Sequence, residues 1–208
     1  MGLIFIFTGL FHRMSYLKHS LLSIGLVLGT MNCFSQVVIT ADKTSGCDSL
    51  TVEFGINPMS DTITSILWDF GDGASETGVI ATHIYPTPGC YDVHVEIVTF
   101  DGCTTDSTYE DFVCVWELPV ADFDYSPEEP DILHNEVEFE NLSESAMTYE
   151  WRFGDGGTSD DFEPDHIYPP YGNMTYPIQL IAITNKGCRD TIVKYVTIQE
   201  VIQYYIPN

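Results

Sequence analysis

Hydrophobic and polar residues alternate along much of the chain, most regularly in DVHVEI at residues 92–97 and EVEFE at residues 136–140. A period of two residues is typical of a strand that buries one face and exposes the other. Similar short stretches recur between Gly, Pro, Asp and Asn, and no window carries the sustained stripe of an amphipathic helix. The pattern therefore predicts an all-β protein. The expected strands span residues 37–41, 50–56, 65–70, 91–100, 111–115, 121–125, 136–141, 148–153, 177–185 and 192–198.

One sequence unit occurs twice. WDFGDG at residues 68–73 is matched by WRFGDG at 151–156, and HIYP at 83–86 is matched by HIYP at 166–169. Both pairs are offset by 83 residues, so the match is one alignment rather than two coincidences. A fixed offset of this size indicates that one structural unit is repeated.

Several short strands in each unit of about 80 residues favour a β-sandwich of immunoglobulin-like architecture. We therefore predict two tandem sandwiches, with domain 1 at residues 36–116 and domain 2 at residues 117–200. The junction WELPV at residues 116–120 is short and contains a proline, which indicates a stiff spacer.

The repeated motif is interpreted as architecture rather than as a reaction centre. Trp68 and Phe70 are two residues apart, so on a strand they share one face, which we assign to the core. Asp69 points the other way, and the second unit has Arg152 at the same place. A position that accepts either charge is a solvated position, and not a catalytic one.

A turn and a corner complete the motif. Glycines at 71 and 73 permit positive φ, and Asp72 between them can bond its own backbone across a tight turn. His83 and Tyr85 share a face at the next corner, where a Tyr hydroxyl commonly bonds nearby backbone. The same roles fall in the second unit to Trp151, Phe153, Gly154, Asp155, Gly156, His166 and Tyr168.

The stretch WDFGDG, followed by HIYPTPGCYDVHV, resembles the PKD (polycystic kidney disease) domain family. The second unit departs from the family pattern at Arg152 and at YPPYGNMTYP, residues 168–177, which replaces the Pro-Gly-x-Tyr corner. The resemblance implies two extracellular β-sandwiches that act as spacer, adhesion or protein/glycan-contact modules, without catalysis of their own.

Residues 1–35 contain no Asp or Glu, and Arg13 and Lys18 precede an apolar run at residues 21–31. This is the pattern of a secretory signal peptide, with Met14 as an alternative start. A lipoprotein modified at Cys33 and an uncleaved anchor helix are the alternative interpretations. With cleavage after residue 35, we expect no membrane span in the mature chain.

Removal of that segment takes away two of the seven basic residues and none of the 31 acidic ones, so the formal charge changes from −24 to −26. Such a surface repels phosphate backbones, and nucleic-acid binding is therefore excluded. A soluble secreted surface accounts for the acidity. Binding of a divalent cation is the alternative, because hard cations prefer oxygen ligands.

The tail VIQYYIPN at residues 201–208, together with the signal, resembles surface proteins of gliding Bacteroidetes. In those proteins a similar segment opens a further C-terminal domain associated with gliding motility and type IX secretion. The resemblance implies a secreted, cell-surface protein that is exported by a type IX-like route. A frayed tail after the last strand is the alternative.

Five of the six cysteines follow the predicted signal, and cysteines of secreted chains usually pair. Strand register places Cys90 opposite Cys114 across a hairpin, which predicts a disulfide. Elimination together with the family resemblance implies Cys47–Cys103 as a second bridge, and leaves Cys188 as a free thiol or an intermolecular partner. Reduced cysteines in the core are the alternative.

Catalytic motifs are lacking in the sequence. DFG at residues 69–71 has no accompanying kinase motifs, the EF-hand spacing fails, and no G-x-S-x-G nucleophile elbow occurs. We therefore expect no enzyme and no cofactor, with Ca²⁺ at the domain junction as an alternative. The expected function is an extracellular spacer or adhesion module that contacts protein or glycan. The alternative is a substrate-binding accessory module of a larger secreted hydrolase acting on polysaccharide or collagen.

Overall fold

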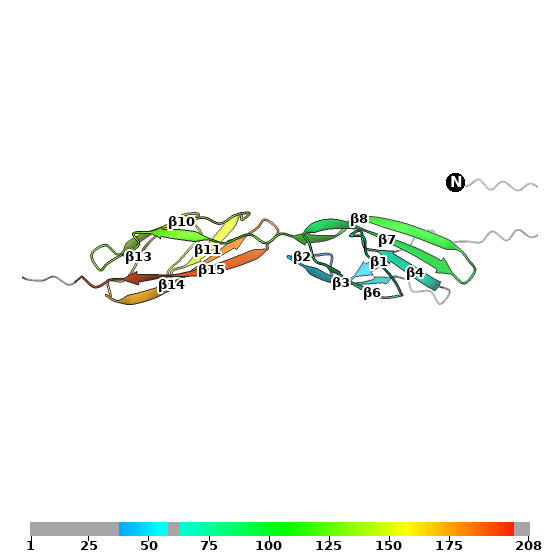
Figure 1. Ribbon diagram of the computed structural model, residues 1–208, viewed down its shortest axis with the longest axis horizontal. Coiled ribbons are helices and arrows are strands. Elements are labelled where there is room, and N and C mark those ends of the chain that lie inside the picture. The colour runs from blue at the N-terminus through cyan, green and yellow to red at the C-terminus, as the bar shows by residue number, and fades with distance from the viewer. Residues whose placement is uncertain (1–37, 58–62, 202–208) are drawn as a thin grey trace, which may run out of the picture. The chain divides into compact units, whose positions relative to one another are not determined.

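The computed structural model describes residues 38–57 and 63–201 (Figure 1). The predicted signal peptide, the alternative start Met14, Cys33 and residues 202–208 of the predicted tail lie outside the described residues. The described residues form strands and connecting loops, with no helix among them. The all-β prediction is therefore confirmed.

The first module (residues 38–116) has two sheets. One sheet has the order β1-β3-β6, and the other has the order β2-β8-β7-β4-β5, in which only β2 runs parallel to its neighbour. The strands are β1 (Ile39–Ala41), β2 (Ser45–Cys47), β3 (Leu50–Ile56), β4 (Ile63–Asp69), β5 (Ser75–Thr77), β6 (Ala81–Tyr85), β7 (Gly89–Thr99) and β8 (Thr104–Trp116).

The second module (residues 117–201) repeats this plan with one strand fewer. Its sheets have the orders β13-β10-β9 and β12-β11-β14-β15. The counterpart of β2 is reduced to one parallel bridge between Asp131 and Gln199. The strands are β9 (Phe123–Ser126), β10 (Glu136–Asn141), β11 (Thr148–Arg152), β12 (Thr158–Ser159), β13 (Asp165–Ile167), β14 (Met174–Ile183) and β15 (Arg189–Ile198).

Each module encloses its own hydrophobic core between its two sheets. Burial alternates along β3 and along β10, so each sheet contributes every second side chain to the core. The largest fully buried side chains include Trp68, Tyr85 and Phe70 in the first module, and Trp151, Tyr168 and Phe153 in the second. These are the aromatic positions of the repeated motif, at the same places in both cores.

The strands that sequence patterning misses are short or lack apolar residues. All three residues of β5 are exposed, so no alternation marks it. The first half of β8, Thr104–Glu110, places Thr, Ser and Tyr where a core strand has aliphatic residues, so the predicted strand began only at Asp111. The alternation of hydrophobic and polar residues reveals a strand only where the face of the strand that points to the core is apolar.

Within residues 38–57 and 63–201, no helical segment has the length and apolar character that a membrane crossing requires.

Candidate functional site

The tryptophans of the motif are structural in both modules. Trp68 and Trp151 are almost wholly buried. Each indole Nε1 donates a hydrogen bond to a backbone carbonyl ten residues further on, to Gly78 at 2.9 Å and to Asp161 at 3.0 Å. The aromatic body fills the core while its polar group is satisfied, as a buried tryptophan requires.

The Gly-Asp-Gly turn depends on left-handed backbone. Gly71 has φ of +79° and Gly154 has φ of +84°, a region that side chains disfavour. A Cβ on Gly71 would lie 2.2 Å from the carbonyl oxygen of Asp92, so the turn packs directly against strand β7. The Gly71 amide donates to Asp69 Oδ1 at 3.0 Å, which gives this solvent-facing carboxylate a local backbone partner.

An Asp–His pair follows each turn. His83 Nε2 and Asp72 Oδ2 are 2.7 Å apart, and His166 Nε2 and Asp155 Oδ2 are 2.8 Å apart. Each imidazole also stacks on the motif phenylalanine with ring centroids 4.1 Å apart. The pair therefore fastens the turn to the strand that carries the histidine, β6 in the first module and β13 in the second.

The two turn carboxylates are more acidic than usual. Burial raises the pKa of Asp72, but hydrogen bonds from His83 and from the Ala74 amide outweigh it, so the pKa lies below its ordinary value. The pKa of Asp155 is lowered in the same way, by the Gly157 amide and His166 acting against burial. Both groups are therefore carboxylates in the folded protein at neutral pH.

The corner tyrosines differ between the modules. Tyr85 Oη donates to the backbone carbonyl of Phe70 at 3.2 Å, the backbone bond that the corner position predicts. The hydroxyl of Tyr168 is buried and has no hydrogen-bond partner among the described residues. Burial raises the pKa of both hydroxyls, so both stay protonated.

A hydrogen-bonded Asp–His pair is also part of some catalytic triads, which additionally need a nucleophile beside the imidazole. Each imidazole stacks on a phenylalanine ring and meets a tyrosine ring at nearly a right angle. These rings are Phe70 and Tyr85 in the first module, and Phe153 and Tyr168 in the second. Among the described residues, neither cluster contains a Ser or Cys nucleophile. The arrangement stabilises a turn in each module.

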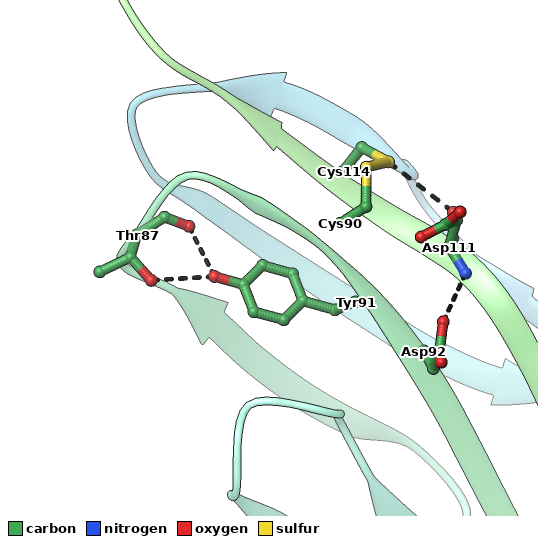
Figure 2. The surroundings of a disulfide bond; sticks show 6 residues. All are labelled: Thr87, Cys90, Tyr91, Asp92, Asp111 and Cys114. Carbon is green, nitrogen blue, oxygen red and sulfur yellow. Dashed lines mark hydrogen bonds between the residues drawn. A yellow bond between two sulfur atoms is a disulfide. The ribbon is translucent and has the colours of Figure 1, made fainter.

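The hairpin of β7 and β8 carries the disulfide that strand register predicts. Cys90 and Cys114 are directly opposite each other and are joined by a disulfide (Figure 2). Beside it, Tyr91 turns back to donate to the carbonyl of Thr87 at 2.7 Å, and the Asp111 amide donates to Asp92 Oδ1 at 2.7 Å. These bonds hold the bulge between Tyr91 and Val93 in place.

The predicted Cys47–Cys103 bridge is wrong, because Cys47 is joined to Cys188 of the second module. Strand β2 pairs with the last residues of β8, so Cys47 lies level with Trp116, whereas Cys103 precedes Thr104 at the opposite end of β8. At about 3.3 Å per residue the two ends of β8 are roughly 40 Å apart. Disulfides need Cα atoms within about 7 Å.

The expected state of Cys188 and the expected partner of Cys103 are also wrong. Cys188 is neither free nor intermolecular, and Cys103 is itself disulfide-bonded. The described cysteines therefore include no free thiol. The sequence prediction failed because it did not detect strand β2. The three residues of β2, Ser-Gly-Cys, show no apolar alternation, so nothing in the pattern placed Cys47 beside the module junction.

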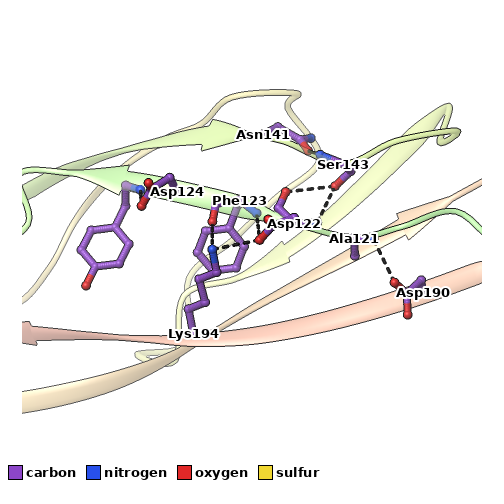
Figure 3. Close-up of polar contacts among 9 residues, drawn as sticks. Ala121, Asp122, Phe123, Asp124, Asn141, Ser143, Asp190 and Lys194 are labelled. Atoms are coloured by element: carbon purple, nitrogen blue, oxygen red, sulfur yellow. Dashed lines mark hydrogen bonds and ion pairs between the residues drawn. The ribbon is translucent and has the colours of Figure 1, made fainter.

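Contacts that we call the Lys194 latch join the start of the second module to its last strand (Figure 3). The Ala121 amide donates to Asp190 Oδ2 at 2.8 Å, and Lys194 Nζ lies 2.9 Å from Asp122 Oδ1 while also donating to the Phe123 carbonyl. The hydrogen bond from Lys194 lowers the pKa of Asp122. The latch consists of Ala121, Asp122, Phe123 and Tyr125 on one side and Asp190, Lys194 and Tyr195 of β15 on the other.

The side chain of Trp116, at the start of the linker, contacts the second module. Its ring is partly buried, and the ammonium of Lys186 lies 4.4 Å from the ring centroid. Lys186 belongs to the β14–β15 turn, which also carries Cys188. The cation and the disulfide therefore reach the same end of β8 from the second module.

Carboxylates are frequent on the surface, and some of them line one hollow. A shallow hollow beside β9 and β10 is lined by acidic residues that include Asp124, Glu138, Glu140 and Asp165. Among the described residues, no group of three or more His, Cys, Asp or Glu side chains is arranged to hold a metal ion. Calcium binding stays a prediction, which calorimetry of chelator-treated protein at millimolar Ca²⁺ tests.

A family model for the PKD domain matches residues 36–115 and again residues 116–198. Among curated proteins, a microbial collagenase of Vibrio alginolyticus is 40% identical over 47 residues, which is 23% of this chain and 6% of the collagenase. This chain thus corresponds to a small part of the length of that relative.

Several solved structures are similar to parts of this chain. The PKD1 domain of the Vibrio cholerae metalloprotease PrtV is 27% identical, with a TM-score of 0.34, and the match covers 39% of this chain and 98% of that domain. The PKD1 domain of Vibrio anguillarum Epp is 23% identical, with a TM-score of 0.35 and coverage of 40% and 96%. Fibronectin(III)-like modules of Clostridium thermocellum CbhA are 12% identical, with a TM-score of 0.43 and coverage of 82% and 100%.

Proposed function

Because this chain belongs to the PKD domain family, in two tandem copies, we propose that it is a non-catalytic extracellular spacer and adhesion segment at a bacterial cell surface. Its partners would be extracellular proteins or glycans. The observation that supports the proposal is the structural role of the repeated motif. In both modules the motif aromatics fill the core and the Asp–His pair fastens a turn, so the most distinctive side chains of the chain are all occupied in the fold.

The disulfides support an extracellular location. Cys90–Cys114 and Cys47–Cys188 both lie in a protein with a leader-like first segment, and disulfides persist in oxidising compartments. We further propose retention at the cell surface after export by a type IX-like route, as in gliding-motility-associated proteins. The support for that route is the resemblance of the tail at residues 201–208.

A second candidate function is an accessory module that holds a larger secreted hydrolase on its substrate. The identity with part of a microbial collagenase favours it. Exposed aromatic rings are the features that could contact a polymer, and Tyr171 and Tyr195 are 67% and 64% exposed.

Sedimentation with insoluble chitin, cellulose and collagen fibrils distinguishes the two functions. The spacer proposal predicts that the purified chain stays in the supernatant and hydrolyses none of the three polymers. Retention that is lost in Trp116→Ala or Tyr195→Ala would support the accessory module instead. Lys186→Ala is the matched control, because it uncovers the Trp116 ring without removing it and should preserve any retention that the ring supports. Hydrolysis by the purified chain would overturn both candidates.

A further inference from the structure

We propose that the Cys47–Cys188 disulfide is a tension bypass. When the chain is pulled at its two ends, force passes from β2 through the disulfide into β15, and the enclosed strands of the second module, β9 to β14, carry none of it. The inference deepens the proposed spacer function, since a spacer between a cell and its surroundings is held under tension.

Covalent topology is the first step of the argument. The two cysteines are separated by 141 positions, so the loop that they close contains β3 to β14, which is nearly all of both modules and the linker between them. A closed loop cannot be lengthened by pulling on the chain outside it. Cys103 also lies inside this loop and is disulfide-bonded, so the argument concerns the second module, whose strands β9 to β14 lie off the path that tension follows.

The second step concerns β15, which begins at Arg189, directly after Cys188. A strand rises about 3.2–3.4 Å per residue, close to the maximum of about 3.6 Å for a fully stretched chain. Tension that enters β15 at Cys188 and leaves beyond Ile198 therefore runs along a backbone that is almost taut. The strand transmits the force along its own covalent bonds, and its hydrogen bonds to β14 need not break.

The third step is what would happen without the disulfide. Tension would then enter the second module through the linker and leave through β15, and the Lys194 latch joins those two segments. Ala121 meets Asp190 and Tyr125 meets Tyr195, so the segments run in the same direction and would be sheared past each other. A few side-chain contacts would have to resist a force that the disulfide otherwise transmits through covalent bonds.

The surroundings of the bridge suit a permanent connection. Cys188 is 1% exposed, and its amide is held by Thr184 Oγ1 at 3.1 Å. A dissolved reductant therefore has little access to that sulfur in the folded protein.

Single-molecule force spectroscopy on the full chain, held by tags at both termini, tests the proposal. The second module gives the clearest signal, because Cys188 is the only cysteine in residues 117–208 and no other bridge can shield this module. Oxidised wild-type protein should show no extension step that corresponds to the second module. Cys188→Ser should release about 80 residues, so the step should equal their contour length, roughly 280 Å at about 3.5 Å per residue, less the span of the folded module.

Matched variants keep the outcome interpretable. Cys47→Ser leaves Cys188 as a thiol and should give the same step as Cys188→Ser. A Cys90→Ser/Cys114→Ser double variant retains the bypass and should show no such step. Far-ultraviolet circular dichroism of each variant establishes that both modules are folded before pulling.

Two results would overturn the bypass. One is a full second-module step in oxidised wild type whose Cys47–Cys188 bridge is verified by peptide mass spectrometry. The other is a folded Cys188→Ser variant that resists unfolding up to the force at which the tags detach. Because the force measurement uses the purified chain alone, either result is independent of the sedimentation assay that tests the spacer function.

Discussion

The corner tyrosines allow a prediction in which the same substitution has opposite effects in the two modules. Tyr85 and Tyr168 are 0% and 1% exposed and pack against equivalent rings. They differ in the hydroxyl, which donates to the Phe70 carbonyl in the first module and has no partner among the described residues in the second. Replacement by phenylalanine removes only that hydroxyl, so the change in stability isolates the hydrogen bond.

The magnitudes follow from the two environments. Tyr85→Phe removes a buried hydrogen bond and leaves the Phe70 carbonyl without it, so the free energy of unfolding of the first module should fall by about 1–2 kcal/mol. Tyr168→Phe removes a hydroxyl that was desolvated without compensation, which ordinarily costs about 1–3 kcal/mol. The free energy of unfolding of the second module should therefore stay the same or rise by about 1 kcal/mol.

Hydrogen–deuterium exchange in the full chain measures each module separately. Amides at the centres of β7 and β14, such as those of Val95 and Leu180, report the opening free energies of the first and second modules. Each variant should change the exchange of its own module, with the other module as an internal control. A loss of stability in Tyr168→Phe as large as that in Tyr85→Phe would refute the reasoning, because it would mean that the Tyr168 hydroxyl is hydrogen-bonded.

Three further predictions concern the repeated turns. Gly71→Ala should destabilise the first module by more than about 3 kcal/mol, because its Cβ would lie 2.2 Å from the Asp92 carbonyl oxygen. At Gly73 a Cβ would have nothing within 4 Å, so Gly73→Ala should cost only the roughly 1–2 kcal/mol of a left-handed backbone. Urea denaturation of the two variants measures the difference. The pKa of Asp155 lies below its ordinary value of 3.8, so its contribution to stability is complete above that pH and is lost as the pH falls through the folded pKa. The difference in unfolding free energy between wild type and Asp155→Asn should thus narrow as the pH falls below 3.8, and a constant difference would contradict this assignment. Arg152→Asp restores the motif residue at an exposed position and should change the free energy of unfolding of the second module by less than about 0.5 kcal/mol in a calorimetric scan. A larger loss would show that the hydrogen bond from Arg152 to Gln179 stabilises the module.

The two modules show which features of the motif the fold requires. Positions that face the core or form the turn keep their residue types in both copies, and their contacts repeat closely, such as the stacking distance of 4.1 Å between His and Phe. The solvent-facing position changes from Asp69 to Arg152 while the turn beside it keeps the same conformation. The motif is therefore a structural device that tolerates either charge on its outer side.

The amino-acid sequence by itself determined the all-β class, the duplication and the core aromatics. These features depend on local alternation and on a repeat offset, and both can be detected without knowing where the strands lie in space. Strands β3 and β10 were predicted with their observed ends, because Leu50–Ile56 and Glu136–Asn141 alternate clearly. The Cys90–Cys114 bridge followed from register within one hairpin, which is also local information.

Only the tertiary structure decided which distant segments meet. Cys47 pairs with Cys188 because a three-residue strand without hydrophobic alternation, β2, lies along the end of β8 beside the module junction. The partner of the Tyr85 hydroxyl and the lack of one for Tyr168 likewise depend on the packing of the sheets. Residue pattern specifies which face of a strand is buried, but the contacts between strand ends depend on sheet order and strand length, which no local pattern encodes.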